Sequence, residues 1–262
     1  MSIFSEQLSQ LSEHLQHDPS VFALLLTGQE GIGEPAAEAE LDVMIVVSDE
    51  EFEERLQSGC LHYRAVDMTE KGQYGGGING KYISPSYMEK VARFGSEPAR
   101  FTFMGSVIVF SHLPELRSMI NEITEFPLHQ KQANINRFYA QFEAWYQECR
   151  KALQSNEHYL LHQSVMNMIL FSGRLILSHN EMLYPGHKSL IHMLEHARKK
   201  PDQLLPVMQT LMTSPSELSL ERLYRQIRDY DRWVNEDLNW TDYVIMDNEL
   251  QWMRRSVSVS EI

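Results

Sequence analysis

The hydrophobic pattern of the chain changes once, at about residue 128, and this change restricts the folds that the chain can adopt. Up to that point the apolar residues gather in short runs of strand length, as in 21–26 and 40–47. Beyond it the strand-like runs stop, and apolar residues recur every three or four positions in long segments. The pattern therefore predicts an α+β protein, with an α/β domain over residues 1–127 and an all-α helical domain over residues 128–262.

The expected elements follow from the same periodicity and from the turn residues between the periodic segments. We expect strands over residues 21–26, 40–47, 61–68, 78–84 and 106–111. We expect helices over 3–17, 85–93, 131–154, 156–180, 187–199, 202–213 and 216–238, and two more that begin near Ser48 and Leu113. The glycine-rich segment 72–77 is expected to be a flexible loop between two strands.

The composition limits the partners and the compartment. A net charge of −13 disfavours nonspecific binding to nucleic acid and to anionic membranes, and it suits a cationic small molecule. Because no run of eighteen apolar residues is present, we expect no transmembrane helix, and the first residues lack the features of a signal peptide. Cys60 and Cys149 have no metal-like spacing, which favours reduced thiols. We therefore predict a cytoplasmic protein with no nucleic-acid or membrane partner.

Two carboxylates, Glu40 and Asp42, open the second apolar run, one residue apart. Side chains alternate along a strand, so both point to one face, roughly 7 Å apart. Two negative charges this close favour a divalent cation between them, and Mg²⁺ holding a polyphosphate is the natural candidate. The turn after the first run begins at Gly28, where backbone amides can approach a phosphate without a Cβ in the way. For each feature alone, an exposed strand face and an ordinary loop are the alternatives.

The spacing of these residues resembles the signature of the DNA polymerase β-like nucleotidyltransferase superfamily, a Gly-Ser turn, a further glycine and an Asp-x-Asp pair. The residues that fall on those positions are Gly28, Gly33, Glu40 and Asp42. Segments 80–84, 95–100 and 180–188 are similar to a bacterial group within the superfamily, the aminoglycoside- or lincosamide-nucleotidyltransferase-like proteins. The resemblance covers most of the chain. It implies a mixed sheet with flanking helices, followed by a helical bundle.

The resemblance also implies an activity, the transfer of a nucleoside monophosphate from a Mg²⁺-bound nucleoside triphosphate, taken here as ATP, to a hydroxyl of a small-molecule acceptor. Glu40 and Asp42 would hold the Mg²⁺ ions of a two-metal mechanism. The implied nucleotide-binding residues are Gly28, Gln29, Gly33, Lys81, His187 and Lys188. An ordinary surface ion pair is an open alternative for Lys81, and an exposed basic turn is one for the pair at 187–188.

Three positions depart from the superfamily pattern. Gln29 replaces a serine whose hydroxyl is usually near the phosphates, and Glu40 replaces an aspartate. Asn79 stands where a third carboxylate is expected to activate the acceptor hydroxyl as a general base, and an amide cannot accept that proton. Asp67 on the preceding strand is a candidate substitute. The alternative prediction is therefore a nucleotide-binding or regulatory protein of the same fold, with impaired catalysis.

Arg174 and His179 have the Arg-x4-His spacing of the helical HEPN ribonucleases, whose fold often accompanies nucleotidyltransferase domains. Residues five positions apart do not share one helical stripe, and such a spacing is frequent by chance on any helix. A ribonuclease site in the helical half is therefore a further alternative, supported by this spacing alone.

Overall fold

The computed structural model describes residues 3–28, 41–68, 74–235, 237–254 and 259. The chain forms two compact units: unit 1 comprises Met1–Gly95 and Ala99–Glu125, and unit 2 comprises Ser96–Pro98 and Phe126–Ile262. Unit 1 contains a five-stranded sheet with helices, and the described chain beyond it is helical. The predicted α+β class is therefore confirmed.

The sheet of unit 1 is mixed. Its strands are β1 (Val21–Thr27), β2 (Leu41–Val47), β3 (His62–Met68), β4 (Tyr74–Ile83) and β5 (Val107–Ser111). They lie in the order β3-β4-β2-β1-β5; β2 and β4 are parallel, and the other neighbours are antiparallel. Strand β2, which carries Asp42, therefore lies at the centre of the sheet.

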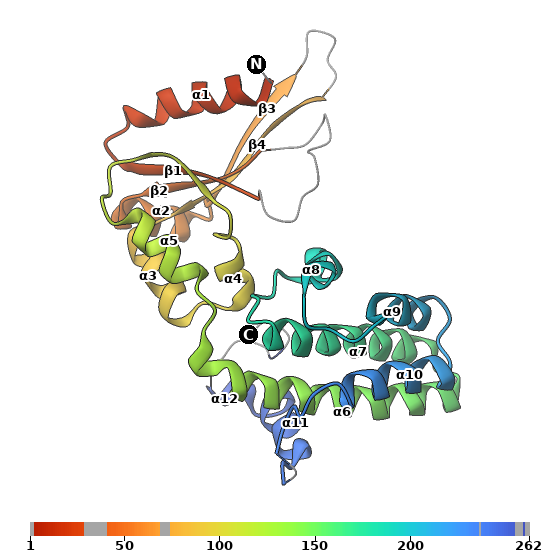
Figure 1. Cartoon of the computed structure of the whole chain (residues 1–262). Helices are drawn as coiled ribbons and strands as arrows, with labels where there is room; N and C mark the ends of the chain where they lie inside the picture. The colour runs from red at the N-terminus through yellow and green to blue at the C-terminus, as the bar shows by residue number, and fades with distance from the viewer. Residues whose placement is uncertain (1–2, 29–40, 69–73, 236, 255–258, 260–262) are drawn as a thin grey trace. The chain divides into compact units, whose positions relative to one another are not determined.

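Helices cover both faces of this sheet (Figure 1). The helices of this part of the chain are α1 (Ile3–Gln16), α2 (Asp49–Ser58), α3 (Pro85–Phe94), α4 (Glu97–Phe101) and α5 (Leu116–Thr124). On one face Leu11 of α1 packs in a buried cluster with Ile45 of β2. On the other face Met44 of β2 packs with Met88 of α3 and Ile120 of α5. Because neighbouring strand residues face opposite layers, β2 is buried from both sides over most of its length.

Helix starts in unit 1 follow capping chemistry that is readable from the sequence. The Ser48 Oγ accepts a hydrogen bond from the backbone N–H of Glu51 at 3.2 Å, which caps α2 as predicted. The Ser84 Oγ accepts from the backbone N–H of Tyr87 at 3.2 Å, and Pro85 occupies the first turn of α3. The helix expected from Leu113 begins later, at Leu116.

The glycine-rich segment is part of the sheet, so the predicted loop over 72–77 is wrong for residues 74–77. Strand β4 begins at Tyr74, and its first residues pair with β3 through Val66 opposite Gly77 and Met68 opposite Tyr74. Backbone groups alone form this ladder, and side chains are not needed for it. Composition indicated a turn here, but pairing with the neighbouring strand β3 determined the structure.

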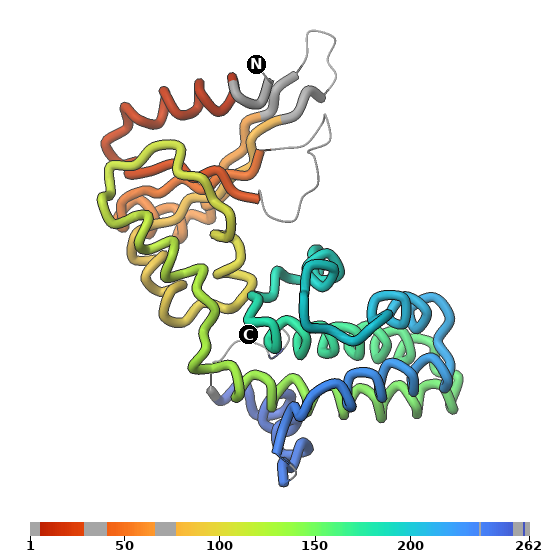
Figure 2. Tube along the Cα trace, in the orientation of Figure 1, coloured from red at the N-terminus to blue at the C-terminus, as the bar shows by residue number. Residues whose placement is uncertain are grey.

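Unit 2 is built around two long antiparallel helices. Its helices are α6 (Lys131–Ser155), α7 (His158–His179), α8 (Leu190–His196), α9 (Leu204–Thr213), α10 (Glu217–Arg228), α11 (Trp240–Asn248) and α12 (Gln251–Arg254), with short 3₁₀ turns at Leu128–Gln130 and His187–Ser189. The α6 and α7 helices run side by side (Figure 2). Phe142 of α6, Phe171 of α7 and Leu223 of α10 belong to one buried cluster, so a single core joins these helices.

Helix α10 ends ten residues before the predicted boundary at 238. It stops at Arg228, and the indole N–H of the buried Trp233 donates to the carbonyl oxygen of Ile227 at 2.7 Å. That carbonyl is one of the terminal acceptors that a helix leaves without an internal partner. The chain therefore turns back at the end of α10 and places Trp233 in the core, where the sequence pattern predicted continued helix.

Helix α7 is the one described helix that is long and apolar enough to cross a membrane by length and composition. Because no run of eighteen apolar residues is present, the sequence predicted no transmembrane helix, and α7 is a candidate by length and mean hydropathy alone. Most of its apolar window is buried within the protein, and residues such as Met168, Phe171 and Leu175 lie in the core of unit 2. Burial of this kind is typical of the central helix of a bundle.

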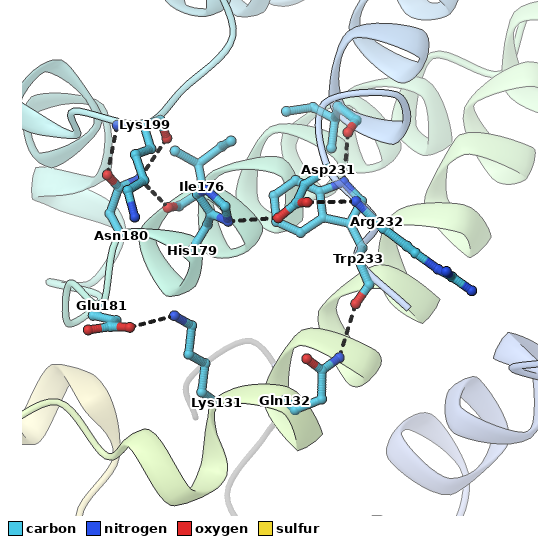
Figure 3. Close-up of polar contacts among 11 residues, drawn as sticks. Lys131, Gln132, Ile176, His179, Asn180, Glu181, Lys199, Asp231, Arg232 and Trp233 are labelled. Atoms are coloured by element: carbon cyan, nitrogen blue, oxygen red, sulfur yellow. Dashed lines mark hydrogen bonds and ion pairs between the residues drawn. The ribbon is translucent and has the colours of Figure 1, made fainter. Parts of the chain in front are cut away.

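Asn180 connects the end of α7 to the segment after α8 (Figure 3). Its Nδ2 donates to the carbonyl oxygen of Lys199 at 2.7 Å and to that of Ile176 at 2.8 Å. Its Oδ1 accepts from the backbone N–H of Lys199 at 2.8 Å. One side chain therefore satisfies backbone groups that would otherwise need other partners.

Replacing Asn180 by alanine is expected to lower the free energy of unfolding by about 1–2 kcal/mol, because three hydrogen bonds to the backbone are lost. Urea denaturation followed by circular dichroism measures the change. Asn167→Ala on the same helix is the matched control, since Asn167 bonds only the Gln163 carbonyl of its own helix. An equal effect of the two substitutions would contradict the bridging role of Asn180.

Candidate active site

The candidate site is centred on Asp42, at the start of β2. Asp42 pairs with Thr27 on β1 and with Asn79 on β4, so these three residues lie in one row across the sheet. Asp42 and Met44 are two positions apart and share the face that α3 and α5 cover. Unlike Met44, Asp42 is exposed, which leaves its carboxylate accessible to a ligand.

A chain of hydrogen bonds runs from Asp42 through Asn79 to His62. The Asn79 Nδ2 donates to the Asp42 Oδ1 at 3.1 Å, and the Asn79 Oδ1 lies 2.6 Å from the His62 Nε2. A carboxylate only accepts hydrogen bonds, so the NH₂ group of Asn79 must face Asp42 and its oxygen must face His62. That oxygen in turn requires a proton on the His62 Nε2. The arrangement fixes both the amide orientation and the imidazole tautomer.

The second carboxylate oxygen of Asp42 faces the glycine turn. Gly28 has a φ of +74°, in the left-handed region that favours glycine, and a Cβ at this position would lie 3.2 Å from the Asp42 Oδ2. Any other residue would be strained and would crowd this oxygen. Asp42 therefore has one oxygen held by Asn79 and the other turned toward the turn where the phosphates were predicted.

Lys81 supplies a positive charge on the same face as Asn79, two positions along β4. Its Nζ is 3.5 Å from the Thr102 Oγ1, a long contact for a hydrogen bond. Partial burial lowers the pKa of Lys81, and the negative charge of Asp42 opposes that shift. The predicted cation therefore lies near the predicted anion, while its contact with phosphate stays a prediction.

The described residues supply part of a Mg²⁺ site. Among them, no group of three His, Cys, Asp or Glu side chains is arranged to hold a metal ion. Glu40, Gln29 and Gly33 lie outside the described residues, as does the side chain of Asp67. Mg²⁺ in nucleotide enzymes commonly takes one or two protein carboxylates and completes its shell with phosphates and water. The Asp42 Oδ2, in the space that Gly28 leaves, fits the role of one such ligand.

His62 is the residue of this hydrogen-bond chain that the sequence did not single out. It is exposed near the start of β3, an edge strand, and it pairs with Lys81 of β4. Alternation along β3 places His62 and Arg64 on one face, but only the β3–β4 register brings that face beside Asn79. The one indication in the sequence was that His62 falls in a predicted strand next to the predicted strand that carries Asn79.

His187 and Lys188 belong to unit 2, in the 3₁₀ turn that precedes α8. Both are exposed, and the His187 ring lies edge-on to that of Tyr184, with 6.1 Å between the centroids. Their contact with a nucleotide stays a prediction.

Arg174 is a core residue, which argues against the ribonuclease alternative. Its side chain is fully buried, and its Nη2 is 3.1 Å from the Oε1 of Glu97, itself buried. The guanidinium Cζ also lies 4.3 Å from the Phe138 ring centroid and 4.2 Å from that of Tyr184. The second residue of the motif, His179, bonds Asp231 through its Nδ1 at 2.9 Å (Figure 3). A guanidinium enclosed in this way cannot reach an RNA phosphate.

Comparison with known proteins bears on the fold. No family model matches this sequence, and no curated protein matches it. Among solved structures, the chain is similar to a nucleotidyltransferase-like protein from Exiguobacterium sibiricum, with a TM-score of 0.51 and 10% sequence identity. The match covers 96% of this chain and 80% of that one. The sheet and the helical region together therefore have a nucleotidyltransferase-like fold.

Proposed function

We propose that the protein transfers a nucleoside monophosphate from a Mg²⁺-bound nucleoside triphosphate, with ATP as the first candidate, to a hydroxyl of a small molecule. The observation that carries the proposal is the Asp42 carboxylate, whose second oxygen faces the Gly28 turn in a sheet of this fold. A glycine turn beside an exposed strand carboxylate suits a metal-bound polyphosphate. Resemblance to aminoglycoside- and lincosamide-modifying proteins makes such polyhydroxyl compounds the first acceptors to test.

Each residue of the site has a separate role in this proposal. Asp42, with Glu40, would hold the metal, and Asn79 would keep the Asp42 carboxylate in one orientation. Lys81 would offset phosphate charge, and the chain that follows Gly28 would surround the phosphates. Bound Mg²⁺ would neutralise the charge that develops on the departing pyrophosphate.

A second candidate function is nucleotide binding without turnover. The hydrogen bond between Asn79 and Asp42 favours it, since an amide occupies the corner where the related enzymes place a general base. Binding without product formation would distinguish this function from transfer.

Calorimetric titration of ATP and GTP, with and without Mg²⁺, tests the proposal. In the native protein, Mg²⁺ is expected to tighten nucleotide binding by at least about tenfold, a change of about 1.4 kcal/mol. Asp42→Asn keeps the size of the side chain and removes its charge, so the dependence on Mg²⁺ should be lost. Glu54→Gln, at an exposed position on α2, is the matched control. Binding that does not depend on Mg²⁺, or no binding at all, would overturn the proposal.

A further inference from the structure

We propose that His62 is the general base of the transfer, taking the proton of the acceptor hydroxyl in place of the missing third carboxylate. This inference rests on the proposed function. It starts from the position of His62, one hydrogen bond beyond the amide that stands in the place of the carboxylate.

The tautomer of His62 leaves one nitrogen free to act as a base. Because the Asn79 amide faces Asp42 with its nitrogen, its oxygen accepts from the His62 Nε2 across 2.6 Å. In the neutral ring the proton is then on Nε2 and the lone pair is on Nδ1. In Ser-His-Asp and Cys-His-Asn enzymes, too, one imidazole nitrogen takes the proton while the other donates a hydrogen bond to an oxygen acceptor. Asn79 therefore acts here as the residue that orients the base.

The exposure of His62 makes this nitrogen available to a substrate. His62 lies near the start of an edge strand, and its side chain is exposed in unit 1. Because Nε2 faces Asn79, Nδ1 is on the opposite side of the ring, and an acceptor hydroxyl would reach it from that side. Exposure of the ring among the described residues suits a small polyhydroxyl acceptor.

The reaction step balances with the nucleotide as the only co-reactant. The hydroxyl proton passes to the His62 Nδ1 as the acceptor oxygen forms a bond to the α-phosphorus. The bond from that phosphorus to the bridging oxygen breaks, and pyrophosphate leaves with the electron pair. The imidazolium then returns its proton to water. No oxidant or reductant is needed.

Among the residues that the structure describes on these strands, three charged groups share the sheet face with His62 and could also affect a pH profile. Lys81 is its partner on β4, Arg64 is two positions along β3, and Asp42 lies beyond Asn79. All three are kept in the variants below, so that a changed profile reports the imidazole.

Comparison of His62→Gln with the native protein tests the role directly. Glutamine can still donate to Asn79 but cannot accept the proton, so the chemical step should slow while nucleotide binding is unchanged. Formation of nucleotidylated product from ATP is measured from about pH 5 to 9 with an aminoglycoside, a lincosamide and glycerol as probe acceptors. We expect kcat to fall by about 10²-fold or more and KM for ATP to change by less than about twofold. A rise of the native rate with pH, as expected of a reaction that needs an unprotonated base, should disappear in His62→Gln. His17→Gln, at another exposed histidine of unit 1, should leave both unchanged.

A second measurement needs neither metal nor nucleotide. In ¹⁵N-histidine-labelled protein, the His62 signal is assigned by its loss in His62→Gln. We expect a proton on Nε2 that exchanges slowly enough to be detected, and Asn79→Ala should abolish its detection. The same spectrum should show Nδ1 without a proton in the neutral ring.

The outcomes separate the two proposals. Failure of the native protein to bind Mg²⁺-ATP would overturn the proposed function. Binding without product from any of the three acceptors, an unchanged pH profile in His62→Gln, or a proton on Nδ1 would overturn the role of His62 and leave nucleotide binding intact.

Discussion

Replacing Arg174 by methionine is expected to lower the free energy of unfolding by about 3–5 kcal/mol, the largest stability effect predicted for this chain. The substitution keeps a long side chain in the core but leaves the Glu97 carboxylate buried without its cationic partner. The Glu97 Oε2 would keep its hydrogen bond from the backbone N–H of Tyr184, at 2.7 Å. Neutral donors offset only part of the cost of burying a charge. The contacts of the guanidinium with the Phe138 and Tyr184 rings would also be lost.

Chemical denaturation measures this loss, and two further variants isolate its cause. Glu97→Gln combined with Arg174→Met removes the charge as well as its partner, so the double variant should be more stable than Arg174→Met alone. Lys151→Met breaks the exposed pair with Glu148 and should change stability by less than about 0.5 kcal/mol. If the free energy of unfolding fell no more in Arg174→Met than in Lys151→Met, the pair of Arg174 with Glu97 would not stabilise the core.

Asn79→Asp is expected to restore transfer to the His62→Gln protein by about 10²-fold. The new carboxylate would stand directly across the sheet from Asp42, at the position where the proposed transfer lacks a third carboxylate. It can accept the hydroxyl proton that glutamine at position 62 cannot. Because an ordinary aspartate titrates at about pH 4, the acid limb of the rate profile should also move to lower pH. Product formation across the pH range measures both effects.

The same substitution has a cost that Mg²⁺ should reverse. Without the metal, the hydrogen bond between Asn79 and Asp42 is lost and two negative charges repel each other in its place. The melting temperature of the protein should therefore fall. Addition of Mg²⁺ should raise the melting temperature more than it does in the native protein. Asn121→Asp, at an exposed position on α5, controls for an added charge elsewhere. No rescue by Asn79→Asp would contradict the assignment of a base to this corner.

Local patterns in the sequence predicted the elements that depend on local chemistry. The apolar run at 21–26 and the serine at position 48 fixed a buried strand and a helix start, because burial and capping act within a few residues. The start of β4 and the end of α10 were missed. The start of β4 depends on its pairing with β3, and the end of α10 depends on the packing of Trp233 into the core; the composition of either segment alone does not encode these contacts.

The same distinction holds for the candidate site. The two carboxylates at the start of an apolar run singled out Asp42 as a candidate residue, and glycine chemistry predicted the turn at Gly28. The role of Asn79 as a donor to Asp42 and the place of His62 depend on strand register. Register is set by the whole sheet, so no motif within β3 could reveal that its histidine adjoins the site.

The position of Glu97 in the sequence affects how the protein is made. Residues Ser96–Pro98 belong to unit 2 although the residues on both sides belong to unit 1, so unit 2 is discontinuous along the chain. Glu97, whose carboxylate lies in the core of unit 2, is synthesised 77 residues before Arg174. At about 5–20 residues per second, the ribosome delivers the arginine about 4–15 s after the glutamate. During that interval Glu97 remains hydrated, and the helical unit can complete its core only after α7 has left the ribosome.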